Sequence, residues 1–161
     1  VTEADWDRIM NVNVKSIVFM CKYAIPQMIK DGGGSIVNIS SIAGMRANQS
    51  TPYTTSKAAV IGLTFSMASD HGRDNIRVNC IAPGLVYTPM VAPRMDASLR
   101  KTRKEASLLG TEGTAWDIGW AAVFLASDES RWITGIVLPV DAGLTASTPV
   151  TFSALAQQQW R

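Results

Sequence analysis

The sequence predicts an α/β fold, a doubly wound parallel sheet with helices on its faces. Three observations support this prediction. Short runs rich in β-branched residues are separated by long stretches in which apolar residues recur at helical spacing. The strand-like runs are followed by Ser41, by Pro83-Gly84 and by Asp141-Ala-Gly143, as expected where a parallel sheet binds ligands beyond the carboxyl ends of its strands. The 161 residues are 47% hydrophobic and 17% charged, which is enough apolar material for one core.

The first elements expected are a long helix and a strand. Residues 2–5, Thr-Glu-Ala-Asp, form a capping box, and apolar residues then recur at helical spacing until three glycines at 32–34 stop the pattern. Residues 35–40, Ser-Ile-Val-Asn-Ile-Ser, follow directly. They are rich in β-branched residues, which predicts a strand.

A second helix and a second strand are expected after a loop at 41–51. Pro52 suits the first helical position behind Thr51 as the N-cap, and this helix is expected to close at Gly72. Residues 76–82, Ile-Arg-Val-Asn-Cys-Ile-Ala, form the next predicted strand, which a Pro-Gly pair halts.

The remaining elements are a long connection, a helix and a third strand. Residues 85–113 mix prolines, methionines and charges with a weakly helical stretch near 96–108, which is typical of a binding loop or lid. The methionines of this connection predict an adaptable apolar pocket. A second capping box at 114–117 opens a helix to about residue 127, and residues 135–140 form the third predicted strand.

Composition indicates one domain or part of one, which we divide into residues 1–146 and a surface tail at 147–161. A formal net charge of +2, from 15 basic and 13 acidic residues, gives no electrostatic basis for binding nucleic acid or a membrane. No apolar stretch approaches the length of about 18 residues needed to span a bilayer and no signal peptide opens the chain, so we expect a cytoplasmic location. Residue 1 is Val and helical signals begin at once, which we interpret as a cut rather than a native terminus.

Two cysteines and one histidine bear on metal and redox chemistry. Cys21 and Cys80 lie in apolar sequence surroundings, where cysteines are more often buried thiols in a reducing compartment than a disulfide. His71 is the only histidine, and we therefore expect no zinc site.

Tyr53 and Lys57 are the residues best suited to chemistry. They lie four positions apart in the second predicted helix, so their side chains share one face. A tyrosine hydroxyl ordinarily loses its proton only at about pH 10, and an adjacent ammonium favours the phenolate. Tyr53 would then be a usable acid or base. The alternative is an ordinary surface pair, because this spacing often occurs by chance.

Three further groups are candidates, and each has a structural alternative. Ser41 follows the first strand, where it can bond a substrate oxygen or only cap a turn. Asn13 takes an apolar position of the first helix, as a buried amide that either supports a proton-conducting water or is a structural core group. Residues 83–88 offer an exposed amide at Val86 and a hydroxyl at Thr88 that can bind an amide or phosphate, or they form a plain Pro-Gly turn.

Several motifs occur in an order that is itself informative. They are Val-Asn13, Ile-Val-Asn-Ile-Ser-Ser41-Ile-Ala-Gly, Tyr53-Thr-Thr-Ser-Lys57, Arg77-Val-Asn79-Cys-Ile-Ala-Pro-Gly, Thr88 and Val-Asp141-Ala-Gly. Together they resemble the classical short-chain dehydrogenase/reductases over roughly residues 2–146. The resemblance implies a partial Rossmann-like sheet, with the three C-terminal strands and their helices, and an NAD(P)-dependent oxidoreductase that interconverts an alcohol and a ketone.

The resemblance also implies catalytic roles. Tyr53 would be the acid/base, Lys57 would bind the nicotinamide ribose and tune the tyrosine, Ser41 would orient the substrate, and Asn13 would support the proton relay. The substrate implied is a small alcohol or carbonyl compound. One mild departure is Val-Asp-Ala-Gly, which stands where Val-Asp-Gly-Gly is common in the family.

Four residues after the second strand match the family segment that contacts the nicotinamide end of NAD or NADP: Pro83, Gly84, Val86 and Thr88. The glycine-rich phosphate turn that precedes these motifs in the family does not occur in the 161 residues. We therefore expect weak cofactor binding by this chain alone. The position that distinguishes NAD from NADP lies in the same missing half.

Assembly is a further expectation. In the resembled family the first two long helices present here commonly pair across a subunit interface, which implies a homo-oligomer. An isolated chain would expose a sheet edge and apolar helix faces, so it should be marginally stable or associate. A second function therefore stays open, in which a truncated chain without catalysis of its own acts as an assembly module.

Overall fold

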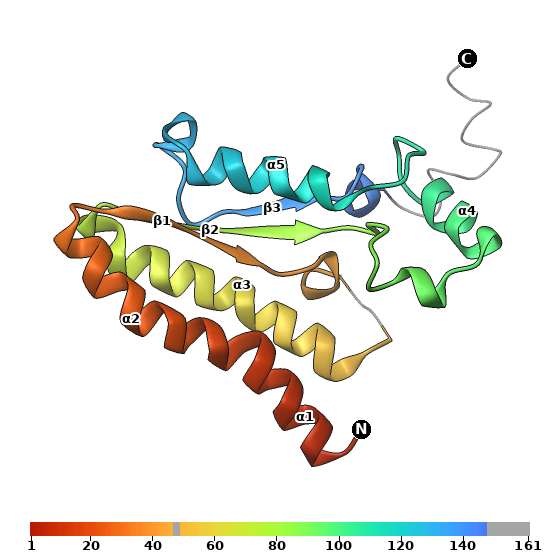
Figure 1. Ribbon diagram of the computed structural model, residues 1–161, viewed down its shortest axis with the longest axis horizontal. Helices are drawn as coiled ribbons and strands as arrows, with labels where there is room; N and C mark the ends of the chain where they lie inside the picture. Colours follow the sequence, from red (N-terminus) through yellow and green to blue (C-terminus); the bar gives the residue numbers. More distant parts are fainter. Residues whose placement is uncertain (47–48, 148–161) are drawn as a thin grey trace.

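A three-stranded parallel sheet forms the centre of the molecule. The computed structural model describes residues 1–46 and 49–147. The strands are β1 (Gly34–Ile39), β2 (Ile76–Pro83) and β3 (Val137–Val140), in the order β1-β2-β3 with parallel neighbours (Figure 1). The predicted parallel sheet is confirmed, and each strand begins and ends within two residues of its predicted bounds.

The register of the strands brings their carboxyl ends together. Ile39 of β1 lies opposite Ile81 of β2, and Pro83 of β2 lies opposite Val140 of β3. The segments that follow the strands therefore meet at one edge of the sheet, where parallel sheets bind their ligands.

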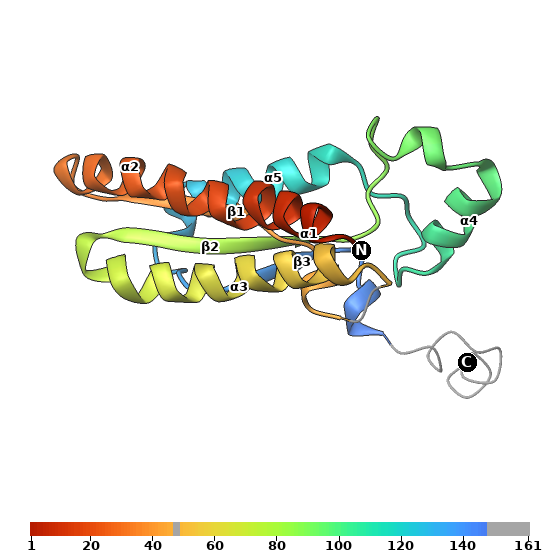
Figure 2. The same cartoon turned by 90° about the horizontal axis from the view of Figure 1, so that it is seen from below.

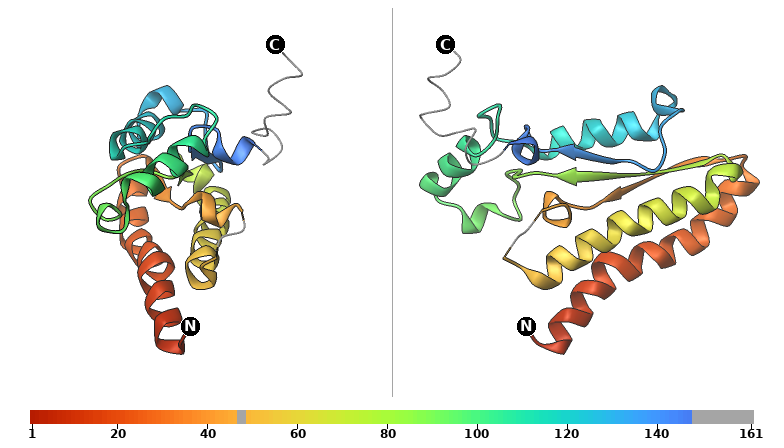
Figure 3. Two further views of the ribbon diagram at one scale, coloured as in Figure 1. Left: turned by 90° about the vertical axis from the view of Figure 1, so that its right-hand side faces the viewer. Right: turned by 180° about the vertical axis from the view of Figure 1, so that it is seen from behind.

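Helices cover both faces of the sheet. α2 (Ser16–Lys30) and α3 (Thr51–His71) pack on one face, and α5 (Ala115–Ala126) packs on the other (Figure 1 and Figure 3). Figure 2, seen from below, shows α2 and α3 running in the same general direction as the sheet, with β2 visible between them. α4 (Ala97–Glu105) lies beyond the carboxyl ends of the strands, within the long connection that was predicted to be a lid.

The first predicted helix has the expected extent but contains a wider turn. Thr2 caps α1 (Glu3–Met10) by accepting the Asp5 N–H at 3.1 Å, and a π-helical turn at Asn11–Lys15 joins α1 to α2. Such turns insert one residue without ending a helix and are frequent at functional sites. A single inserted residue barely disturbs the apolar periodicity, so the sequence predicted an uninterrupted helix.

The ends of α3 differ slightly from their predicted form. The N-cap is Ser50 and not Thr51. Gly72 follows the last helical residue as expected, but its φ of −60° continues the right-handed path into a short 3-10 turn. The left-handed residue is Asn75, with φ 59°, and its Nδ2 donates to the Gly32 carbonyl at 2.9 Å. An asparagine can replace the glycine because it tolerates this backbone region.

Local caps begin the last two helices, and the cap of α5 is the capping box that the sequence predicts. The N–H and Oγ1 of Thr114 donate to Asp117 Oδ2 at 2.6 and 2.8 Å, which completes the capping box of α5 and lowers the pKa of Asp117. Asp96 accepts the Leu99 N–H at 2.7 Å and caps α4. Short 3-10 turns complete the fold at Ile42–Gly44, Gly72–Asp74, Ala92–Arg94, Asp128–Ser130 and Leu144–Ala146.

The main apolar core lies between β2 and the helices α2 and α3. Its buried members are Cys21, Ile25, Met67, Ile76 and Val78. Both cysteines are buried free thiols, as their sequence surroundings predicted, and burial raises the pKa of each.

Two polar side chains of β2 hold the connections on the opposite face. Arg77 Nη1 donates to the Leu125 carbonyl at 2.8 Å and to Ser130 Oγ at 2.9 Å. Asn79, which is fully buried, donates to the Ile133 carbonyl at 2.9 Å and accepts the Ile136 N–H at 3.3 Å. These bonds fix the end of α5 and the entry into β3.

The predictions about the tail, membrane spans and metal sites concern the whole chain, of which the structure describes a part. Of the predicted tail at 147–161, residues 148–161 lie outside the described residues. Within the described part of the chain, no helix is both long and apolar enough to span a membrane. The same residues contain no group of three or more His, Cys, Asp and Glu side chains placed to hold a metal ion.

Gly44 brings the turn after β1 into backbone contact with α3. A Cβ atom at this position would lie 2.7 Å from the carbonyl carbon of Lys57 and 2.8 Å from its oxygen. Ser40 Oγ donates to the same carbonyl at 2.7 Å. Because these neighbours are backbone atoms, a side chain at Gly44 would push the turn away from α3.

We predict that Gly44→Ala lowers the free energy of unfolding by about 1–3 kcal/mol, the usual cost of overpacking. Gly62→Ala in α3 is the matched control, because nothing lies within 4 Å of the added Cβ. Alanine also has the higher helix propensity, so Gly62→Ala should be neutral or stabilising. Urea unfolding measures both changes, and equal stability of the two variants would contradict the contact.

Candidate active site

A hollow of about 640 Å³ lies at the carboxyl edge of the sheet. It is bounded by the turn after β1, the first turns of α3 and the segment after β2. Seven of the eight predicted site residues line it: Ser41, Tyr53, Lys57, Pro83, Gly84, Val86 and Thr88. The eighth, Asn13, is not among the lining residues.

Tyr53 and Lys57 lie together in this hollow. Lys57 Nζ is 5.8 Å from the centroid of the Tyr53 ring and donates to the Ile39 carbonyl oxygen at 3.0 Å. That bond ties the ammonium to the last residue of β1. Burial lowers the pKa of Lys57, and the charge of the Cys80 sulfur opposes this shift. A half-buried cation is therefore held beside the tyrosine.

Two adjacent serines take different positions at the end of β1. Ser40 is buried, and its hydroxyl is committed to the Lys57 carbonyl. Ser41 Oγ accepts the Ala43 N–H at 3.1 Å and so caps the following 3-10 turn. No acceptor for the Ser41 hydroxyl hydrogen occurs among the described residues, so this hydroxyl can still donate to a ligand in the hollow.

Asn13 lies in the π-helical turn and is connected to α3 through one intervening side chain. Its Nδ2 donates to Ser56 Oγ at 3.0 Å, and Ser56 Oγ donates to the Tyr53 carbonyl oxygen at 2.7 Å. Ser56 is fully buried. Two hydrogen bonds thus connect Asn13 to the backbone of the first turn of α3.

The segment after β2 approaches the end of β3 closely, but it lacks the predicted free amide. A Cβ atom on Gly84 would lie 2.6 Å from Asp141 Cα, so only glycine fits between the ends of β2 and β3. The Val86 N–H was expected to be exposed, but it donates to the Gly84 carbonyl at 3.0 Å. Thr88 Oγ1 lines the hollow and has no hydrogen-bond partner within the described residues.

Asp141 organises the turn after β3. Its Oδ2 accepts the Thr145 N–H and Oγ1 at 2.8 and 2.7 Å, and its Oδ1 accepts the Gly143 N–H at 2.9 Å. Between them, Ala142 adopts φ 54°, a left-handed conformation that costs an alanine on the order of 1 kcal/mol. This conformation explains why glycine is common at the same place in the sequences that the motif resembles.

The connection between β2 and α5 folds over the edge of the hollow. Arg100 of α4 donates to Glu112 through Nε at 3.0 Å and Nη2 at 2.5 Å. Its guanidinium carbon also lies 3.9 Å from the centroid of the Tyr87 ring. This bidentate pair and the stacking hold α4 against the segment after β2.

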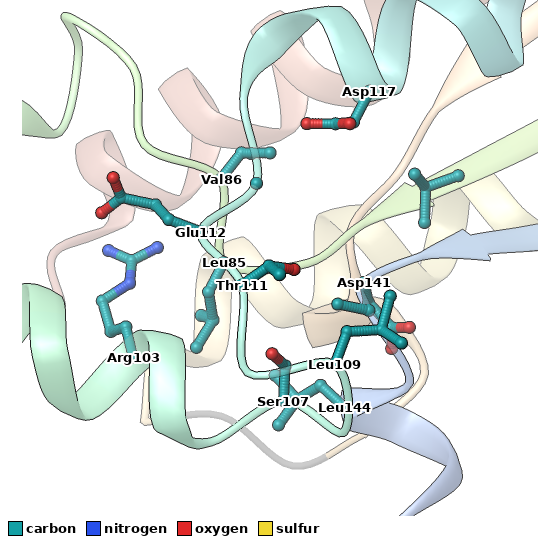
Figure 4. A pocket seen from close by; sticks show the side chains of 13 residues that line it. Leu85, Val86, Arg103, Ser107, Leu109, Thr111, Glu112, Asp117, Asp141 and Leu144 are labelled. Carbon is teal, nitrogen blue, oxygen red and sulfur yellow. The ribbon is translucent and has the colours of Figure 1, made fainter.

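Sequence reasoning missed two cations of the hollow, Arg46 and Arg103. The lid was expected to supply an apolar lining, and Met90 does so, but Arg103 lines the hollow too. The available signal was the spacing of Arg100 and Arg103, which puts both on one face of α4. Arg103 also borders a neighbouring pocket of about 220 Å³, where its side chain reaches from α4 toward the loop that carries Glu112 (Figure 4).

Comparison with known proteins agrees with this arrangement. The family model described as enoyl-(acyl carrier protein) reductase matches residues 1–145. The 3-oxoacyl-(acyl-carrier-protein) reductase FabG of Thermotoga maritima is 42% identical over 143 residues, which cover 88% of this chain and 58% of that protein. Dehydrogenase/reductase SDR family member 6 of Xenopus laevis is 44% identical over 149 residues, with 88% and 61% covered. The chain belongs to the classical short-chain dehydrogenase/reductase family.

Solved structures show the same relationship. A gluconate 5-dehydrogenase from Burkholderia cenocepacia J2315, in complex with NADP and tartrate, has a TM-score of 0.86 and 33% identity, and the match covers 92% of this chain and 59% of that one. The partial Rossmann-like sheet is therefore confirmed. This short-chain dehydrogenase/reductase chain spans about three fifths of the length of the curated relatives named above.

We predict that Lys57→Met changes how stability depends on pH. Because the folded pKa of Lys57 lies below its usual 10.5, the unfolded chain binds more protons between the two values, and stability rises with pH there. The free-energy cost of burying the charged Lys57 is fully present below its folded pKa and disappears as the pH approaches 10.5. The unsubstituted protein should therefore gain stability relative to Lys57→Met from neutral pH toward about pH 10.

Urea unfolding at several pH values measures this difference. Burial raises the pKa of the Cys80 thiol, which is present in both proteins. Lys101→Met on the exposed side of α4 is the control, and its stability difference should stay flat. A pH-independent difference for Lys57→Met would show that burial does not disfavour the charged form.

Proposed function

We propose that this protein is an NAD(P)-dependent oxidoreductase that interconverts an alcohol and a ketone, with Tyr53 as the acid/base. The observation that carries the proposal is that Ser41, Tyr53 and Lys57 line one hollow at the carboxyl edge of the sheet. The names of the relatives, which are reductases and dehydrogenases, support the same class of reaction. The substrate is a small alcohol or carbonyl compound.

Tyr53 exchanges a proton with the substrate oxygen in this proposal. The Lys57 ammonium lies 5.8 Å from the centroid of the Tyr53 ring on the same face of α3, so a positive charge stands beside the reacting group. Ser41 supports the same oxygen, since its hydroxyl can donate a hydrogen bond while its oxygen caps the turn. These two hydroxyls orient the reacting carbon and stabilise the charge that develops on its oxygen.

Asn13 acts as a positioning residue. The bonds from Asn13 through Ser56 hold the turn of α3 from which Tyr53 extends. The π-helical turn at Asn13 also changes the pattern of backbone hydrogen bonds next to α3. We propose that this turn supports the proton relay that connects the active helix with solvent.

The residues present fit the nicotinamide half of the cofactor. The hollow combines apolar lining with a Thr88 hydroxyl and the Lys57 ammonium, which suits an amide, a flat ring and ribose hydroxyls. When bound, the cofactor supplies or accepts the hydride. Pro83, Gly84 and Val86 shape the wall against which the nicotinamide would rest. Either NAD or NADP satisfies these groups.

We predict that Tyr53→Phe lowers kcat/KM for carbonyl reduction by about 100- to 10,000-fold, because the change removes the acid/base and keeps the ring. The fall in absorbance of the reduced nicotinamide cofactor measures the rate of the native protein and of the variant. The control is Tyr23→Phe on α2, which lies outside the hollow and keeps its ring for packing, so the rate should be unchanged. Near-normal activity of Tyr53→Phe would rule out Tyr53 as the acid/base.

We further propose that the protein is a homo-oligomer in which α2 and α3 pack against a second copy. The support is a set of large apolar side chains exposed on these neighbouring helices: Val18, Phe19, Met20, Tyr23 and Phe65. Large apolar side chains exposed on neighbouring helices often mark an interaction surface. An assembly module without catalysis would use the same face, so the two functions differ only in activity.

We predict that Phe65→Glu lowers the particle mass in solution, because a charge in an apolar interface is costly to bury. Size-exclusion chromatography with light scattering measures the mass. Leu99→Glu makes the same change on exposed α4 and should leave the mass unaltered. An unchanged mass for Phe65→Glu would place the interface elsewhere, and an oligomer without Tyr53-dependent activity would favour the assembly module.

A further inference from the structure

The charged residues that line the hollow beside Tyr53 are all positive. Its lining includes Arg46, Lys57 and Arg103, and it includes no Asp or Glu. The two segments outside the described residues, 47–48 and 148–161, contain no Asp or Glu in the sequence. Charges of one sign around a partly enclosed space focus the field and attract anions.

Two arginines form the inner face of α4. Every other residue of this helix is exposed, whereas Arg100 and Arg103 are half-buried. Arg100 is fully engaged by the Glu112 carboxylate and the Tyr87 ring. Arg103, one turn further along the same face, has no equivalent partner.

The partners of Arg103 leave most of its donors free. Its Nη1 donates to the Met95 sulfur at 3.1 Å, and a thioether is a weak acceptor. No carboxylate oxygen of the described residues lies within 4.0 Å of its guanidinium nitrogens. Burial lowers the pKa of Arg103, and the charge of Glu112 opposes this shift from a distance. Glu112 already receives both hydrogen bonds of Arg100.

We infer that Arg103 binds an oxyanion group of the substrate, a carboxylate or a phosphate, and that the protein selects anionic alcohols and ketones such as hydroxy acids and their keto forms. This inference rests on the proposed oxidoreductase function. A planar guanidinium suits this task because it offers paired donors to two oxygens of one anion. The reacting oxygen would lie at Tyr53 and Ser41, and the anionic end would point toward the lid.

The position of Arg103 connects substrate binding to the lid. The arginine belongs to α4, which Arg100 already holds against the segment after β2. A substrate anion on Arg103 would therefore contact an element that is fixed in place before binding. Arg46, which donates to the Thr145 carbonyl, adds positive charge at the mouth of the same hollow.

The test compares charged and neutral forms of the same ketone in the native protein with its nicotinamide cofactor. The probes are acetoacetate with methyl acetoacetate, pyruvate with methyl pyruvate, and dihydroxyacetone phosphate with dihydroxyacetone. We expect kcat/KM to be about 10- to 100-fold higher for the charged member of at least one pair, as for other charge-assisted hydrogen bonds. The pair with the larger ratio distinguishes carboxylate from phosphate.

Three variants locate the source of this preference. Arg103→Gln should abolish the ratio, because it lowers kcat/KM for the charged probe only. Arg103→Lys should retain part of the ratio. Lys101→Gln removes the same charge from the exposed side of α4 and should keep the ratio. Stability and the KM for the cofactor should be unchanged in Arg103→Gln.

Several results would overturn the inference. These are equal rates for charged and neutral probes in the unsubstituted protein, an equal loss for both in Arg103→Gln, or a loss that appears in the cofactor KM alone. The last result would assign the oxyanion to the cofactor. Failure of the unsubstituted protein to reduce any probe in a Tyr53-dependent manner would instead reject the proposed function itself.

Discussion

Strand β2 imposes the constraint on which the rest of the structure depends, because it is enclosed by a strand on each side and by helices on each face. A polar side chain in such a strand must find its partners inside the protein. Arg77 and Asn79 find them at the end of α5 and at the entry into β3, so neither connection can shift without leaving buried polar groups unsatisfied. The register that results delivers Pro83 and Asp141 to the same edge.

The cations near the hollow differ in whether their hydrogen-bond partners are charged or neutral. Arg100, which holds α4 in place, has a carboxylate partner, and the pair is locally neutral. Lys57 is instead bonded to a carbonyl and Arg103 to a thioether. Neutral partners stabilise the geometry of a cation without cancelling its field. The hollow therefore keeps a positive potential beside Tyr53 and near the lid, which favours an anionic substrate group.

The sequence predicted the elements well wherever the signal was local. Thr114 and Asp117 form their capping box, and the motif residues line one hollow because strand ends in a parallel sheet meet at one edge. It failed where the signal was a single backbone bond or a long-range contact. The turn that engages the Val86 amide leaves no compositional trace. The inward position of Arg103 could not be predicted because Leu99, the one large apolar residue of α4, is itself exposed, so apolar periodicity does not orient this helix.

The contact between Gly44 and Lys57 separates the chemistry of this site from its specificity. Ser41 lies three residues before Gly44, and Tyr53 lies four residues before Lys57. The contact between the backbones of Gly44 and Lys57, together with the hydrogen bond from Ser40, therefore positions the hydroxyls of Ser41 and Tyr53. Arg46, which lines the hollow, follows this contact in the sequence and takes no part in it. Evolution can therefore change the side chain at position 46 to admit new substrates while the two hydroxyls that we propose for proton transfer stay in place.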